Sequence, residues 1–290
     1  MTAATVAPLG AVGAFADLPA TTGPSRAVRA GRQVVIAIGL LALAVVVWEG
    51  IKAVTGTDDR TMPHLHDIVA YLGSKTSRGE TYGPLLLRNM AVTARGALLG
   101  LGCGAFLGIV SGVLIARSRL IGNGLLPLIV AAQTVPIVAV SPALVLWLGT
   151  GWTTKVAIAT YLTYFPVTVA TARGVQAVPQ DAIDLLHSYA ASRWTVLSQV
   201  ELPYALPLIM VGLETAAAFS VVGTIVGELP FGSKDGLGVM ILTSWQFYTI
   251  QPRALYCVAL GACVLGGALV LGIRLLGFVL SGSRPEGEML

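Results

Sequence analysis

The chain has 290 residues, of which 55% are hydrophobic and only 11% charged. Soluble domains carry roughly 25% charged residues, so the composition excludes an ordinary soluble protein and predicts a protein embedded in a lipid bilayer. The formal net charge is +4, and the basic residues are scattered along the sequence, which excludes nucleic acid as a partner.

The residues that usually hold metals or form disulfides are few. The three cysteines lie in apolar runs without a C-x-x-C pair, which predicts neither a disulfide nor a zinc site. His64 and His66 have no third ligand nearby, so we assign no metal. Since no histidine lies in an apolar run, an intramembrane enzyme is disfavoured.

The N-terminal 32 residues are rich in Ala, Gly, Pro and Thr, and we expect residues 1–32 to be a disordered cytoplasmic tail. The apolar run 33–54 has membrane length and no small-residue cleavage site at its end. We therefore interpret 33–54 as a retained first transmembrane helix and not as a signal peptide. Residues 281–290 are expected to form a second cytoplasmic tail.

Spanning the hydrocarbon takes about 20 apolar residues. The sequence therefore predicts an all-α, polytopic membrane protein with six transmembrane helices, at 33–54, 89–116, 121–148, 152–174, 203–228 and 253–280. An even number of spans places both termini on one side. The arginines before the first span favour the cytoplasm for that side, although the loop 55–88 is also basic.

Apolar residues in the extracytoplasmic loop 55–88 have helical spacing at Leu65, Ile68, Val69 and Leu72. They predict a short amphipathic helix that covers the bundle. The core is then expected at 89–280. Its second span carries glycines at every fourth position from Gly96 to Gly112, a pattern typical of helices that pack backbone to backbone in membranes.

The segment 179–203 lies between the fourth and fifth spans. Pro179 is suited to begin a helix, and an apolar stripe with aromatic residues continues to Pro203. Such amphipathic helices either bury their apolar side chains against their own bundle or offer them to a soluble partner. The pattern alone leaves both possibilities open.

This segment resembles the cytoplasmic signature of ABC importer permeases, E-A-A, three residues, Gly, nine residues, Ile, one residue, Leu-Pro. Here the same spacing joins Asp184, Leu185, Leu186 and Ala190 to the final Val200, Leu202 and Pro203. Alanine stands where the signature has glycine. Because alanine is disfavoured at positive φ, we expect at Ala190 either a turn at negative φ or one continuous helix.

Other stretches resemble the same family, in its branch for nitrate, sulfonates, taurine, thiamine-precursor pyrimidines and riboflavin. They are Gln133-Thr134-Val135-Pro136, Ser141-Pro142-Ala143-Leu144, Trp147-Leu148-Gly149, Gly212-Leu213, Val226-Gly227-Glu228 and Gly236-Leu237-Gly238. The resemblance covers about residues 85–280. The stretch that ends at Glu228 is slightly closer to the pyrimidine and riboflavin members.

The resemblance implies the type I (MetI-like) importer permease fold in the bacterial inner membrane. It implies a second permease subunit as a homodimer, a dimer of ATP-binding cassette subunits and an extracytoplasmic solute-binding protein. The chain itself would be no enzyme and bind no cofactor, with ATP and Mg²⁺ on the partner subunit. The sequence contains no G-x-x-x-x-G-K-[ST] phosphate loop, which agrees with that division.

The resemblance also implies that 179–203 docks on the ATP-binding subunit, and we therefore name it the coupling segment. We expect Leu186, Tyr189 and Trp194 as the docking side chains and Arg193 as a charged contact at the rim.

Polar groups in the spans are candidates for the translocation pathway. Prolines free backbone carbonyls, so Gln133, Thr134, Pro136 and Ser141 are pathway candidates, with helix kinking as the alternative. Glu228 is a further candidate, for gating or subunit contact, with bonding to its own loop as the alternative. An ion-gradient-driven secondary transporter is the competing function, but no convincing internal repeat supports it.

Overall fold

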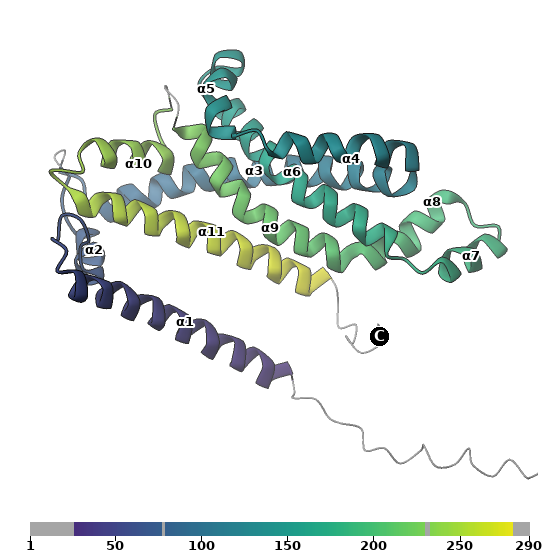
Figure 1. Ribbon diagram of the computed structural model, residues 1–290, viewed down its shortest axis with the longest axis horizontal. Coiled ribbons are helices and arrows are strands. Elements are labelled where there is room, and N and C mark those ends of the chain that lie inside the picture. The colour runs from purple at the N-terminus through teal and green to yellow at the C-terminus, as the bar shows by residue number, and fades with distance from the viewer. Residues whose placement is uncertain (1–25, 77–78, 230–232, 281–290) are drawn as a thin grey trace, which may run out of the picture. The chain divides into compact units, whose positions relative to one another are not determined.

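The computed structural model describes residues 26–76, 79–229 and 233–280 (Figure 1). In this part of the chain the regular structure is helical, with one isolated β-bridge between Lys75 and Thr81. The chain forms two compact units, residues 1–57 and 58–290. The helices are α1 (Arg26–Thr55), α2 (Leu65–Tyr71), α3 (Tyr82–Arg117), α4 (Arg119–Gln133), α5 (Ile137–Leu148), α6 (Trp152–Gln176), α7 (Gln180–Ser188), α8 (Arg193–Val196), a π-helical turn (Leu197–Glu201), α9 (Leu202–Glu228), α10 (Leu237–Gln246) and α11 (Pro252–Leu280).

The described part of the first unit is the single helix α1. It begins at Arg26, inside the stretch 1–32 that was expected to be a tail. Arginine and alanine are good helix formers, and no proline or serine interrupts the sequence between Arg26 and the apolar run. The rest of that tail, residues 1–25, lies outside the described residues, as does the expected tail 281–290.

Four described stretches are long and apolar enough to cross a membrane: α1, α3, the continuous stretch Arg193–Glu228 that ends in α9, and α11. The pair α4 and α5 makes a fifth if it is counted as one span. The helix α6, expected to span at 152–174, has 25 residues and so is long enough to cross a membrane, but its composition is less apolar than that of these four stretches. Its buried side chains include several threonines, and these face protein.

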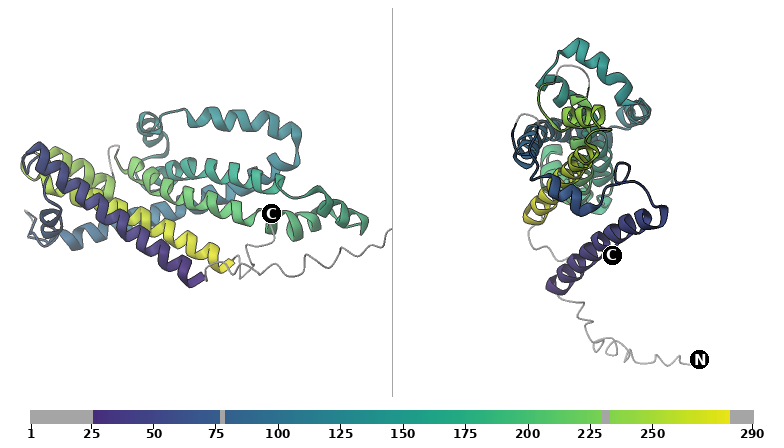
Figure 2. Two further views of the ribbon diagram at one scale, coloured as in Figure 1. Left: turned by 60° about the horizontal axis from the view of Figure 1, so that its bottom comes forward. Right: turned by 90° about the vertical axis from the view of Figure 1, so that its left-hand side faces the viewer.

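The stretch 121–148 was expected to form one span, but it contains two helices that meet at 97°. Figure 2 shows α5 turning away from the direction of α4. The break lies at Pro136, which has no N–H to continue the helical ladder and which disfavours helical geometry at the preceding residue. Gly149, at a φ of 80°, then ends α5.

The centre of the second unit is α6, which packs against both α3 and α9, and these two helices also contact each other. The glycine ridge of α3 faces α6: a Cβ added to Gly104 would overlap the Thr163 side chain, and one added to Gly108 would lie 2.8 Å from Val167 Cβ. Glycines of α9 approach α6 in the same way, and a Cβ added to Gly223 would lie 2.7 Å from Ala159 Cα. The ridge predicted from sequence is therefore a close contact within one chain.

The predicted loop helix is present as α2 and covers the ends of α3 and α11. Ile68 is 2% exposed and packs in a cluster with Tyr82, Leu86 and Cys257. The Cys257 thiol donates to the Ile68 carbonyl at 3.0 Å, and Arg253 pairs with Asp67 at 3.2 Å. An apolar hollow of about 280 Å³ remains between α2, α3 and α11.

The glycine contact predicts a strong effect of Gly104→Leu. The new side chain would overlap Thr163, and overpacking of this kind costs about 1–3 kcal/mol or more. We expect less monodisperse permease after extraction, measured by size-exclusion chromatography. Gly102→Leu is the matched control, because an added Cβ there meets no atom within 4 Å. Equal yields of the two variants would contradict the contact.

Candidate functional site

The coupling segment forms two short helices that project at one end of the bundle (Figure 1). Between them, the Ala190 N–H donates to the His187 carbonyl at 2.9 Å, and the Ala191 N–H donates to the Leu186 carbonyl at 3.1 Å. These two bonds form a Schellman motif, in which the residue after the helix adopts the left-handed conformation. Ala190 indeed has a φ of 53°.

Both expectations for Ala190 are therefore wrong, since the turn is neither at negative φ nor replaced by one helix. The hydrogen bonds of the Schellman motif satisfy two carbonyls that α7 would otherwise leave open, and the alanine accepts the unfavourable φ. The next helix, α8, has its own start signal: the Ser192 hydroxyl accepts from the Thr195 N–H at 3.1 Å.

Three large side chains of the coupling segment are exposed. Tyr189 is 77% exposed, Trp194 72% and Leu185 58%. Leu186, expected as a docking residue, is half-buried, while Arg193 is exposed. Exposed apolar groups of this size on helices that flank a tight turn are typical of a surface that binds a partner.

Attachment of the segment to the bundle begins in α8. Val196 and Leu197 are buried, and Val200, Leu202 and Pro203 continue half-buried into α9. Asp184, in α7, is exposed and accepts from Gln180 at 3.0 Å.

Arg117, at the end of α3, forms an ion pair with the coupling segment. Its Nε donates to Glu201 Oε2 at 3.0 Å, and its Nη2 donates to the Arg193 carbonyl at 2.7 Å. Its pairing with Glu201, 84 residues away, has no sequence signal.

The opposite end of α9 holds a buried polar cluster around Glu228. Its carboxylate accepts from Lys155 Nζ at 3.3 Å, from the Thr93 hydroxyl at 3.0 Å and from the Gly238 N–H at 2.9 Å. Lys155 and Glu228 are 5% and 1% exposed. The alternative that Glu228 bonds to its own loop is thus present, and its role in a pathway stays a prediction.

The same cluster explains the Gly236-Leu237-Gly238 stretch. The Gly236 N–H donates to Asn89 Oδ1 at 2.7 Å, and the Leu237 N–H donates to the Thr93 hydroxyl at 2.9 Å. Gly236 has a φ of 127°, and a Cβ there would overlap the Glu228 carboxylate. Only glycine lets the start of α10 approach Glu228 so closely. We did not single out Lys155 from sequence, although an ionisable residue inside an expected span was a usable signal.

The remaining pathway candidates lie at the bend between α4 and α5. Gln133, Thr134 and Pro136 are exposed, and Ser141 is 2% exposed. The prolines free carbonyls four residues earlier, and each finds a partner: Tyr161 donates to Ala132, and Ser141 donates to Val138 at 2.9 Å. Both freed carbonyls thus accept hydrogen bonds from side chains of the chain itself, which agrees with the alternative that the prolines only kink the helix. A contact of these residues with solute stays a prediction.

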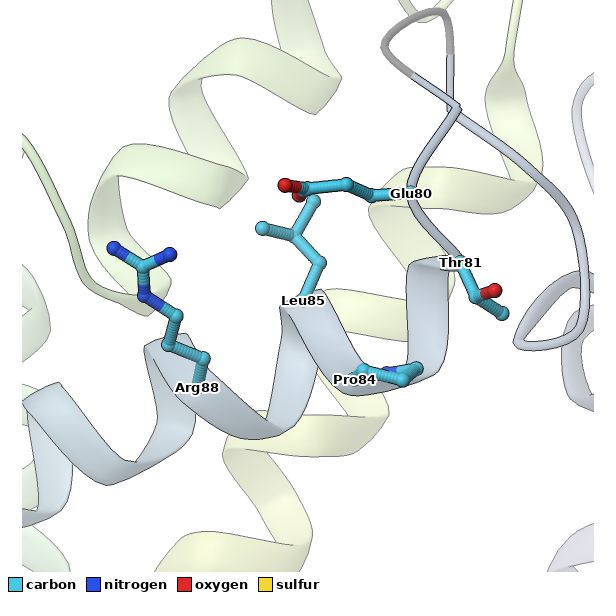
Figure 3. A pocket seen from close by; sticks show the side chains of 5 residues that line it. All are labelled: Glu80, Thr81, Pro84, Leu85 and Arg88. Carbon is cyan, nitrogen blue, oxygen red and sulfur yellow. The ribbon is translucent and has the colours of Figure 1, made fainter.

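A shallow hollow of about 330 Å³ lies at the start of α3. Glu80, Thr81, Pro84, Leu85 and Arg88 line it, and the Glu80 and Arg88 side chains lie on the same side of α3 with Leu85 between them (Figure 3). Among the described residues, no group of three or more His, Cys, Asp or Glu side chains could hold a metal ion.

These features define a multi-pass helical membrane protein in which an exposed segment connects two long helices, α6 and α9. The family model for the binding-protein-dependent transport system inner membrane component matches residues 104–281, and the chain belongs to this family. It is accordingly an ABC transporter permease of the bacterial inner membrane.

Curated relatives carry related descriptions. A probable ABC transporter permease protein of Haemophilus influenzae is 38% identical over 162 residues, which cover 56% of this chain and 66% of that protein. The riboflavin transport system permease protein RibX of Chloroflexus aurantiacus is 36% identical over 43% of this chain and 47% of its own length. The chain thus spans about half to two thirds of these two proteins. The taurine transport system permease protein TauC of Escherichia coli is 28% identical, with 84% of this chain and 88% of that protein covered.

The geometry of the turn predicts that Ala190→Gly stabilises the coupling segment. A left-handed conformation costs an L-residue about 1–2 kcal/mol, which exceeds the entropy that glycine loses on folding. We expect amide hydrogen exchange at residues 187–191 to slow about fivefold, the factor for roughly 1 kcal/mol. Ala191→Gly is the control, since Ala191 is not at positive φ. Equal exchange in the two variants would contradict the assigned strain.

The buried ion pair predicts that Lys155→Met lowers stability more than an ordinary surface change. Removing one partner of a buried pair costs about 3–5 kcal/mol, because the remaining charge is uncompensated. We expect little folded protein from Lys155→Met and partial recovery from Lys155→Met combined with Glu228→Gln. Thermal unfolding of the extracted permease measures both. Lys234→Met, at an exposed loop residue, is the control, and no recovery in the double variant would argue against the pair.

Proposed function

We propose that the chain is the permease subunit of an ATP-driven importer and that two copies form the translocation pathway for a small solute. An extracytoplasmic binding protein delivers the solute. A dimer of ATP-binding subunits, which hold ATP and Mg²⁺, docks on the coupling segment from the cytoplasm. The permease itself is neither an enzyme nor a cofactor carrier.

The observation that carries this proposal is the exposure of Tyr189 and Trp194 on either side of the Schellman turn. A segment that only covered its own bundle would bury such side chains, because burying an aromatic residue removes a large apolar area from water. The exposed surface favours the second of the two possibilities left open by the sequence pattern. An ion-gradient-driven transporter would leave this surface without a role.

The solute is proposed from two observations. The relatives described as permeases for riboflavin and for formylaminopyrimidine are 36% and 34% identical over their aligned stretches, against 28% for the taurine permease. The Val226-Gly227-Glu228 stretch also resembles the pyrimidine and riboflavin members slightly more than the others. We therefore propose a thiamine-precursor pyrimidine or riboflavin ahead of a nitrate-like, sulfonate or taurine-like anion.

The docking surface predicts that Tyr189→Ala and Trp194→Ala weaken binding of the ATP-binding subunit. A truncated aromatic residue that fills a partner's pocket costs about 2 kcal/mol or more. Because both side chains are exposed, the permease should fold normally. Ala190→Glu, which places a bulky charge at the same surface, should have a similar effect.

Co-purification of the ATP-binding subunit with the permease measures this binding. Leu120→Ala is the matched control, since Leu120 is 86% exposed but lies outside the coupling segment. If the three coupling variants retain the subunit as well as the control does, the segment is not the docking site.

A further inference from the structure

One side chain of α3, Arg117, makes two polar contacts with the coupling segment. The Arg117 guanidinium contacts both ends of the stretch that runs from α8 through the π-helical turn. It donates to the carbonyl of Arg193, the first residue of α8, at 2.7 Å, and to the Glu201 carboxylate, the last residue of the turn, at 3.0 and 3.3 Å. The Glu201 side chain is 9% exposed and that of Arg117 is 31% exposed.

The π-helical turn explains how one guanidinium reaches two residues that are eight positions apart. In an undisturbed α-helix, at roughly 100° per residue, positions 193 and 201 would lie about 80° apart around the helix axis. A π-helical turn inserts one additional residue into the ladder, which reduces the difference to about 20°. Leu197–Glu201 forms this turn. Positions 193 and 201 thereby lie on nearly the same side of the stretch, and Arg117 contacts both.

Few other contacts fix the segment. The helix α7 has no buried residue, and within 179–201 the buried residues are Val196, Leu197 and Glu201. Arg117 itself follows directly on the glycine ridge, whose last member, Gly112, lies against Thr171 of α6. Arg117 thus connects α8 to a helix that packs closely against α6.

We propose that Arg117 is a positioning residue for energy coupling: it fixes the orientation of α8, and therefore of Trp194, relative to α3. This inference rests on the proposed function. Arg117 does not contact the ATP-binding subunit in this scheme. It determines whether movement of that subunit reaches the membrane helices.

The test is Arg117→Lys in the full complex of permease, ATP-binding subunit and binding protein in lipid bilayers. Lysine keeps the charge but cannot direct a planar fork at a carboxylate and a carbonyl at once. We expect normal co-purification of the subunit. In this scheme the binding protein, used as purified from cells, stimulates ATP hydrolysis by the complex. We expect this stimulation to be about tenfold smaller in Arg117→Lys, which is the factor for one lost hydrogen bond to a charged group. Amide exchange over 193–201 should rise.

Arg173→Lys is the matched control, because Arg173 is an exposed arginine in the last turn of α6. Glu201→Gln is a second variant that keeps a neutral acceptor, and it should lose stimulation in the same way. Unchanged stimulation and exchange in Arg117→Lys overturn the inference, as does loss of the subunit itself, since Arg117 would then act in docking. If the wild-type permease itself fails to retain the subunit, the proposed function is contradicted instead. Amide exchange over 193–201 in Arg117→Lys still reports the contact of Arg117 with this stretch in that case.

Discussion

Close contact of α6 with α3 and α9 is the constraint on which the second unit depends. In a bilayer the hydrophobic effect does not drive helices together, so helix surfaces must fit at short range. Glycines in both α3 and α9 provide that fit, as at Gly108 and Gly223. A larger residue at either glycine would push apart the helices whose ends carry Arg117 and Glu228. The hydrogen bonds around Arg117 and around Glu228 would then lose their geometry.

The two ends of this helix layer are held in different ways. At one end Glu228 accepts from Lys155, Thr93 and a backbone N–H of α10, all buried, so α10 is fixed to three helices. At the other end the Arg117 guanidinium makes the side-chain hydrogen bonds between α3 and the coupling segment, and α7 has no buried residue. Many buried contacts resist local opening, whereas few contacts permit it. The coupling segment is accordingly the part of this unit in which local opening is least resisted.

The turn at Ala190 shows how function and local stability are related in the coupling segment. The chain keeps a Schellman turn there even though alanine, and not glycine, must adopt a φ of 53°. The turn places Tyr189 and Trp194 on the outer surface, where neither contributes much to folding. Strain of this kind persists only when the surrounding hydrogen bonds determine the conformation.

The sequence by itself determined the all-helical membrane class, α2 and the glycine ridge, because periodicity and composition are local properties. It did not determine the 97° break between α4 and α5, the left-handed Ala190 or the pairs Arg117–Glu201 and Lys155–Glu228. Each pair joins residues more than 70 positions apart. Only the packing of α6 between its neighbours brings such residues within hydrogen-bonding distance, and a charge pattern along the chain contains no information about that packing.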